Sequence, residues 1–171
     1  WLLDAVARDA HEWDEWFGRS IDVGGLEKER NILRYRPAPT QVRGCADAKL
    51  VDVARVVAAG LLAAGDNISV CLDPSLGEGL GRALRSVGVA VTTASDEDWY
   101  ASLGASRVRL VGGNPSRAAD EADGDPDLAL WANEVTSAPQ VELLPFLREQ
   151  SVSATAHRFG NPDAGVLSVR L

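Results

Sequence analysis

The feature that most constrains the fold is a regular alternation of short apolar runs with segments of helical length between Thr40 and Val135. Five runs predict strands: TQVRGC, NISVCLD, VAVTTA, RVRLVGG and DLALWANEV. Four segments between them predict helices: AKLVDVARVVAAGLLAAG, GLGRALRSVG, SDEDWYASLG and PSRAADEADG. Strands joined by helix-length connections pair in parallel. The sequence therefore predicts an α/β domain, with a five-stranded, mainly parallel, doubly wound Rossmann-like sheet and helices on both faces.

Two helices have a distinct apolar stripe. The segment before Gly65 places Leu50, Val53, Ala54, Val57 and Leu61 on one side, and Gly65 suits the end of a helix. The first twenty residues place Leu2, Val6, Trp13 and Trp16 mainly at helical spacing, with acidic residues opposite. We expect both stripes to pack on neighbouring elements.

The segments before and after this alternation are of another kind. NILRYRP alternates side chains in the manner of a strand, and Pro37 cannot donate to a ladder, so the run suits an edge strand. VELLPFLREQSVSATAHRFGNP, from Val141 to Pro162, predicts a helix starting near Glu142, with Pro145 in its first turn. It then changes to strand-like alternation through Val152, Ala154 and Ala156. We expect an N-terminal helix and connector at 1–30, the Rossmann-like domain at 31–136, and a C-terminal motif, flap and tail at 137–171.

Composition excludes several functions. The net charge is -8 and the pI is about 4.7, whereas a phosphate-binding face needs clustered Lys and Arg. We therefore expect no nucleic-acid partner. No apolar run is long enough to span a bilayer and no secretory signal opens the chain, so we expect a cytoplasmic protein. The chain starts at Trp1 and contains no Met, which suggests a fragment of a larger protein.

Titratable groups give little indication of chemistry. Cys45 and Cys71 lack metal-ligand spacing, and we expect buried, inert thiols. Ser95 is a candidate helix N-cap, and the acidic residues Asp96 to Asp98 suit the first turn of that helix, so they need no metal. We expect no catalytic residue and no metal site in this chain.

Two glycine clusters could cradle a dinucleotide. Gly77, Gly79 and Gly81 follow the second strand, but their spacing is G-x-G-x-G, and a glycine-rich helix start is the favoured interpretation. Gly112 and Gly113 follow the fourth strand, with Arg117 as the only cation nearby. Neither cluster is a complete fingerprint.

The chain resembles a known family in two stretches. ELLPFLREQ followed by SVSATAHRFG resembles the C-terminal motif of the longer bacterial proline utilization A proteins and related pyrroline-5-carboxylate dehydrogenases. LEKERNILRYRP, from Leu26 to Pro37, resembles the sequence that leads into the last domain of this family. The two stretches bracket most of the chain.

The resemblance implies a dehydrogenase-like nucleotide domain without its chemistry. LLAAGDNISVCLDPS looks like an aldehyde dehydrogenase segment in which Asp73 stands where a lysine contacts the adenosine ribose of NAD. RVRLVGGNPS looks like the strand before the pyrophosphate helix, and Arg117 falls near a glycine of that loop. Asp73, Gly112, Gly113 and Arg117 are thus degenerate positions, and the catalytic subdomain with its cysteine is missing.

The resemblance also implies a role. NILRYRPAPTQVR and SVSATAHRF resemble the two strands of an oligomerisation flap, so we expect a protruding β-flap built by the segments before and after the sheet. Composition alone favours an ordinary solvated edge there. The resemblance instead predicts docking on the catalytic semialdehyde dehydrogenase domain of the same polypeptide, as a lid over the cavity through which the intermediate passes. The expected interface residues are Arg148, Glu149, Gln150, His157, Arg158 and Phe159.

The family implies cofactors for the parent enzyme but none for this domain. The parent would oxidise proline with FAD and glutamate semialdehyde with NAD. Two alternatives stay open, an active NAD-binding oxidoreductase domain and a plain oligomerisation module forming homo-oligomers.

Overall fold

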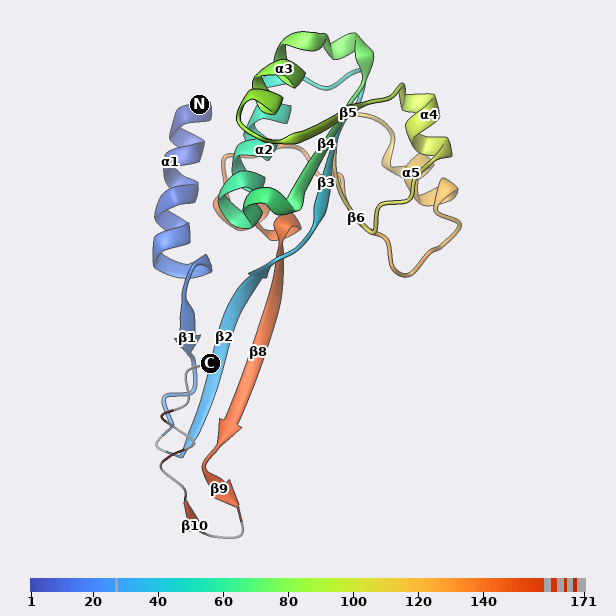
Figure 1. Cartoon of the computed structure of the whole chain (residues 1–171). Helices are drawn as coiled ribbons and strands as arrows, with labels where there is room; N and C mark the ends of the chain where they lie inside the picture. Colours follow the sequence, from blue (N-terminus) through green and yellow to red (C-terminus); the bar gives the residue numbers. More distant parts are fainter. Residues whose placement is uncertain (27, 159–160, 163–164, 166–167, 169–171) are drawn as a thin grey trace. The chain divides into compact units, whose positions relative to one another are not determined.

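The computed structural model describes residues 1–26, 28–158, 161–162, 165 and 168. These residues divide into two compact units. Unit 1 comprises residues 1–10 and 37–147, and unit 2 comprises residues 11–36 and 148–171. Figure 1 labels most of the helices and strands, and each unit is described by itself below.

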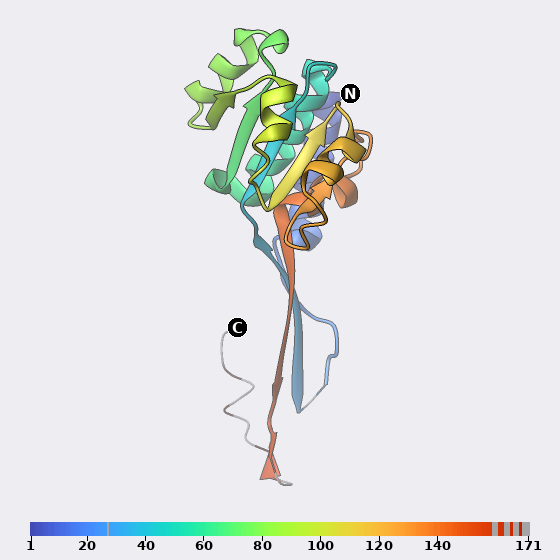
Figure 2. The ribbon, with the colours of Figure 1, turned by 90° about the vertical axis from the view of Figure 1, so that its right-hand side faces the viewer.

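Unit 1 contains the five-stranded sheet that the alternation predicts. Its order is β5-β4-β3-β6-β7, and every neighbouring pair is parallel (Figure 2). The strands are β3 (Thr40–Gly44), β4 (Ile68–Leu72), β5 (Ala90–Thr93), β6 (Arg107–Val111) and β7 (Ala129–Trp131). This is the doubly wound order in which the chain works outward from β3 in one direction and then in the other. The fold class is confirmed.

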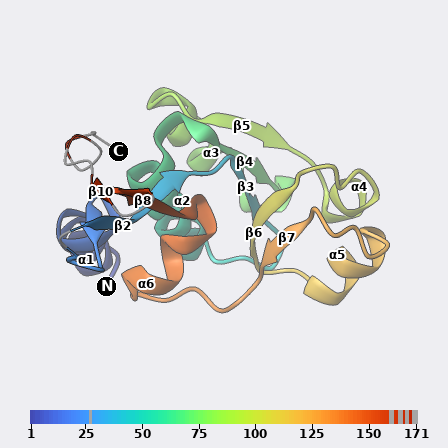
Figure 3. The same ribbon diagram turned by 90° about the horizontal axis from the view of Figure 1, so that it is seen from below.

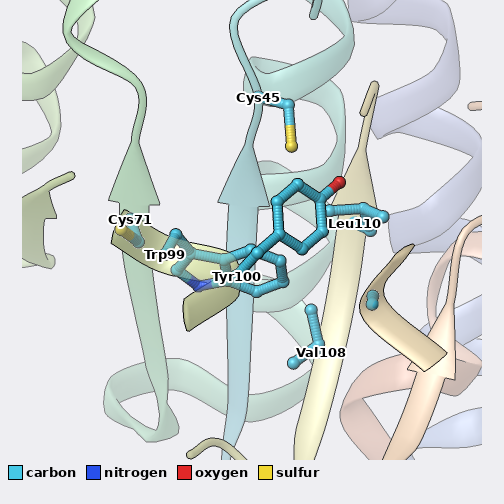
Figure 4. Close-up of a cluster of buried hydrophobic side chains, with 7 residues drawn as sticks. Cys45, Cys71, Trp99, Tyr100, Val108 and Leu110 are labelled. Carbon is cyan, nitrogen blue, oxygen red and sulfur yellow. The ribbon is translucent and has the colours of Figure 1, made fainter. Parts of the chain in front are cut away.

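Helices cover both faces of the sheet (Figure 3). α2 (Leu50–Ala64) and α3 (Glu78–Ser86) pack on one face, where Gly44 approaches Val53 of α2 and Gly81 of α3 approaches Leu72 and Val91. α4 (Asp96–Ala101) and α5 (Pro115–Glu121) pack on the other face. Their core consists of buried side chains from both helices and the strands beneath (Figure 4): Cys45, Cys71, Trp99, Tyr100, Val108, Leu110 and Ala118.

Several local predictions are confirmed. Ser95 caps α4 by accepting a hydrogen bond from the backbone N–H of Asp98, so the acidic first turn of α4 is explained locally. Gly65 follows α2 with φ of 54°. Cys45 and Cys71 are both buried and not disulfide-bonded.

The predicted apolar stripes are only partly correct. α1 (Leu2–Glu12) buries Ala5 and Asp9, whereas Val6 is 37% exposed. α2 buries Val53 and Val57 as expected, but Leu50 and Leu61 lie outward and Arg55 is fully buried. In both helices a charged residue faces inward because it has an ion-pair partner there.

Buried ion pairs and hydrogen bonds connect α1 and the segment around α6 to the rest of unit 1. Asp9 of α1 pairs with Arg55 of α2, with an Oδ1–Nη2 distance of 2.8 Å. Arg55 also donates to the carbonyl of Thr136, whose own N–H donates to Oε1 of Glu142 over 2.9 Å. Glu142 in turn pairs with Arg109 of β6 at 3.0 Å, and both of these side chains are fully buried. The chain of contacts joins four segments that are distant in sequence.

The prediction of a helix that starts near Glu142 is wrong. A four-residue helix, α6 (Pro139–Glu142), ends there, and a 3-10 turn, η4 (Leu144–Phe146), follows. Both elements carry a proline in the first turn, where a missing N–H costs little, so the sequence pattern could not separate Pro139 from Pro145. Leu143 and Phe146 are fully buried in unit 1, where the ring of Phe146 packs against Gly60 of α2.

Unit 2 contains a three-stranded sheet of order β1-β2-β8. Its strands are β1 (Ser20–Asp22), β2 (Glu29–Pro37) and β8 (Leu147–Thr155), and a π-helix, η1 (Trp13–Phe17), precedes them. β2 is therefore the central strand and not the edge strand expected from Pro37. Pro37 is its last residue, so the missing N–H lies at the end of the ladder. A further two-residue pair, β9 (His157–Arg158) with β10 (Asn161–Pro162), is antiparallel.

We expect the buried pair of Arg109 and Glu142 to be needed for the fold of unit 1. Replacing Arg109 with Met leaves the Glu142 carboxylate buried without its cation, which costs about 3–5 kcal/mol. Urea unfolding at pH 7 measures the loss. The matched control is Arg8→Met, which breaks the exposed pair of Arg8 and Asp4 and should cost less than about 1 kcal/mol. Equal losses in the two variants would contradict the assignment.

Candidate functional site

The site that the fold suggests first is the carboxyl edge of the sheet in unit 1. The strand order reverses between β3 and β6, and open α/β sheets bind ligands outside the strand ends at such a point. A pocket of about 430 Å³ lies there. It is lined by the segments after β3, β6 and β7: Asp47, Ala48, Lys49, Asp52, Val111, Gly112, Gly113, Pro115, Ala132, Asn133, Glu134 and Val135. The lining contains three carboxylates and one lysine. Its net negative charge would repel a pyrophosphate.

Side chains of unit 1 fill the space beside the Gly112–Gly113 turn. Both glycines have positive φ, 72° and 74°, which other residues adopt rarely. The N–H of Gly113 donates to Oδ1 of Asp47 over 2.7 Å. A Cβ at Gly112 would collide with the same carboxylate, and one at Gly113 would lie 2.5 Å from the Cys45 sulfur. Internal packing therefore explains both glycines without a ligand.

The amides after the turn are also satisfied by side chains of unit 1. The N–H of Asn114 donates to the Tyr100 hydroxyl over 2.7 Å. The Asn114 side chain accepts from the N–H groups of Ser116 and Arg117, which closes the start of α5. These amides are the groups that would grip an anion in a nucleotide-binding domain.

Arg117 is engaged in the same way. Its guanidinium pairs with Glu97 of α4 at 2.9 Å and lies over the Tyr100 ring, 4.6 Å from the centroid. The side chain thus joins α5 to α4, and it is the only cation that the sequence places close to the glycine pair.

Asp73, at the position that the resemblance assigns to a ribose-binding lysine, has a structural role. Its Oδ1 accepts from the hydroxyl and the N–H of Ser75, at 2.6 and 2.9 Å, and its Oδ2 accepts from the N–H of Asp96. Burial by itself would raise the pKa of Asp73, but these hydrogen bonds and the charge of Arg43 lower it below the usual value. The carboxylate holds the turn after β4 to the start of α4.

The other glycine cluster starts a helix, as the sequence favours. Gly77 is the N-cap of α3 with φ of 77°, and Gly81 lies inside the helix against Leu72 and Val91. Cys45, which follows β3, is not poised as a nucleophile. Burial and the nearby Asp96 raise the pKa of Cys45 to about 12, so its thiol is protonated at neutral pH. Within the described residues no cluster of His, Cys, Asp and Glu could hold a metal ion.

The predicted interface residues fall on unit 2. Arg148, Glu149 and Gln150 are consecutive on β8 and all exposed. Gln150 accepts a hydrogen bond from Nε of Arg34 over 2.7 Å, and Glu149 accepts one from the Tyr35 hydroxyl over 3.4 Å. His157 and Arg158 form β9, of which only the backbone is described, and Phe159 lies outside the described residues.

Sequence reasoning missed the partners of these residues on β2. Arg34 and Tyr35 contact β8, and the ring of Tyr35 packs against Phe17 with centroids 4.9 Å apart. The alternation in NILRYRP carried the signal, because it places Arg34 and Tyr35 on opposite faces of one strand.

Comparison with known proteins finds similarity to solved structures. No family model matches the chain, and no curated protein does. Among solved structures, proline utilization A (PutA) from Corynebacterium freiburgense matches with a TM-score of 0.58 and 25% sequence identity. The match covers 92% of this chain and 14% of that protein. The chain is similar to a domain-sized part of PutA.

The similarity to PutA covers most of this chain but a small part of that protein. It supports a domain related to a part of PutA, and it extends over almost all of this chain. Because the chain spans about 14% of the PutA polypeptide, the activities of the whole protein are not carried over by it. Of the helices in the described part of the chain, none is long and apolar enough to cross a membrane.

We expect Asp73 to stabilise unit 1 in a pH-dependent manner. Its pKa is lowered in the folded chain, so its contribution is present above the unfolded value of about 3.9 and is lost as the pH falls through the folded value. Asp73→Asn should therefore unfold at lower urea than the parent chain at pH 7, and the difference should shrink below about pH 4. A difference that stays constant from pH 7 to pH 3 would contradict this role.

Proposed function

We propose that this chain is a non-catalytic C-terminal domain of an enzyme that converts proline to glutamate. In this proposal unit 2 docks β8 on the semialdehyde dehydrogenase domain of the same polypeptide and covers the cavity through which the intermediate passes. The parent would use FAD for the first oxidation and NAD for the second, and this domain would bind neither.

One observation carries the non-catalytic part of the proposal. The amides that would hold a pyrophosphate already donate to Asp47, Tyr100 and Asn114, which belong to the same unit. A dinucleotide would have to displace a carboxylate that sits against Gly112, in a pocket with a net negative lining. The similarity to a part of PutA supports the metabolic context.

The docking part rests on β8. Strand β8 is an edge strand of its sheet, and it carries consecutive exposed polar residues. Edge strands with free backbone groups and exposed polar side chains are suited to protein interfaces. The mechanism is steric, because a covered cavity keeps a diffusible intermediate close to the second active site.

The first experiment is a truncation of the enzyme that contains this chain. Removing residues 148–171 deletes most of β8 but spares the buried Glu142, Leu143 and Phe146, which unit 1 needs. We expect a lag before NADH forms from proline and a lower coupled rate, while each half-reaction measured separately is unchanged. If the lag and the coupled rate are unchanged, the lid role is wrong. If there is no lag but solution scattering shows a changed assembly state, a plain oligomerisation module is favoured.

The second experiment separates this proposal from an active NAD-binding oxidoreductase domain. NAD titrated into the isolated chain by calorimetry should give no saturable heat up to about 1 mM, an affinity weaker than about -4 kcal/mol. The positive control is the same titration into the enzyme that contains the chain. Saturable binding with a dissociation constant of micromolar order would favour the oxidoreductase alternative.

A further inference from the structure

The side chains of unit 2 fix the register between β2 and β8. Tyr35 meets Glu149, Arg34 meets Gln150, and Asn31 accepts a hydrogen bond from the Ser153 hydroxyl over 2.7 Å. Each step back along β2 is matched by an equal step forward along β8, so the two strands are antiparallel. The N–H of Ala156 donates to the carbonyl of Lys28, which continues the same register.

This register places Arg36 directly opposite Arg148. Side chains two residues apart on a strand share a face, so Arg36 lies on the face of Arg34, and Arg148 lies on the face of Gln150. The hydrogen bond between Arg34 and Gln150 shows that these are one face. Three guanidinium groups therefore share one side of the ladder, those of Arg34, Arg36 and Arg148.

Arg36 and Arg148 have no ion-pair partner among the described residues. Arg34 bonds to a neutral amide, and Glu149 lies on the opposite face with Tyr35. Arg36 and Arg148 are both exposed. Like charges directly opposite each other on neighbouring strands destabilise a sheet, so this pair is unfavourable in the free chain.

The overall charge of unit 2 does not account for this pair of arginines. Unit 2 contains eight basic and eight acidic residues in its sequence, and unit 1 contains nine and 17, which together give the 17 and 25 of the whole chain. The net charge of -8 thus belongs to unit 1. The cationic pair is a local feature of a neutral unit and not part of a generally basic surface.

We propose that Arg36 and Arg148 form a carboxylate-binding clamp for the protein surface on which β8 docks. The partner places an Asp or Glu side chain between the two guanidinium groups, which converts the repulsion into charge-assisted hydrogen bonds. Planar guanidinium groups suit this contact because each presents paired N–H donors to a carboxylate. The partner is therefore acidic at this point. The inference rests on the proposed docking of unit 2.

The first test uses the chain alone and a double-mutant cycle of melting temperatures. Arg36→Gln and Arg148→Gln each relieve the repulsion, so each should raise the melting temperature at low salt by about 1–4 °C. The double variant should gain little more than either single variant. Arg82→Gln, which removes an exposed charge on α3, is the matched control and should combine additively with Arg36→Gln. Losses on single substitution would reveal an internal partner and overturn the clamp.

The second test uses the enzyme that contains the chain and reverses the charges. Arg36→Glu with Arg148→Glu should reproduce the lag caused by removing residues 148–171, with both half-reactions intact, whereas Arg82→Glu should not. If the truncation produces a lag and the charge reversal does not, the clamp is wrong while the lid role stands. If the reversal changes only the sedimentation behaviour of the enzyme, the carboxylate belongs to a second copy, and the proposed partner is wrong.

Discussion

The ion pair between Arg109 and Glu142 is the contact on which the arrangement of unit 1 depends most. It lies at zero exposure, and through Thr136 it continues to Arg55 and Asp9. The pair anchors α6, so that η4 can present the Phe146 carbonyl to the N–H of Ala38 and the Pro145 carbonyl to Thr40. Arg107 donates to the carbonyls of Pro145 and Leu147 from the other side. The last segment of unit 1 is thereby held beside the start of β3 by hydrogen bonds, by the buried ion pair and by the buried Leu143 and Phe146, and not by a long helix.

The same pair explains where sequence reasoning succeeded and where it did not. The strands from Thr40 onward were predictable, because each is a short apolar run between turn residues and that pattern is local. The sequence predicts a helix starting near Glu142 because Leu143, Leu144 and Leu147 recur at helical spacing and Pro145 suits a first turn. The true partner of Glu142, Arg109, sits in an apolar run 33 residues earlier, and periodicity contains no information about such a contact. The buried face of α1 was misjudged for the same reason, since Asp9 faces inward to meet Arg55.

The position of the candidate site at the sheet edge could be predicted from the sequence, but the group that fills it could not. Strand order follows from the alternation of strands and helices, so Gly112 and Gly113 were identified as the position of a possible anion site. Their backbone angles fit that expectation, but Asp47 supplies the anion. Asp47 follows β3 and Gly113 follows β6, and only the fold brings them together. A glycine pair in a turn therefore indicates a close approach, and the sequence does not tell whether a ligand or a side chain makes it.

The two units differ in how their charges are balanced. In unit 1 the buried guanidiniums of Arg43, Arg55 and Arg109 each face a carboxylate, so the interior is electrically balanced and the excess of acid lies outside. In unit 2 two arginines lie opposite each other on exposed strands, where a repulsive pair costs at most about 1 kcal/mol because water screens it. A cost of that size is tolerable in a free chain. It becomes a gain when a carboxylate arrives and water is excluded, because a charged contact strengthens as the surrounding dielectric falls. A surface that is slightly unfavourable alone and favourable when covered is suited to docking rather than to solvent.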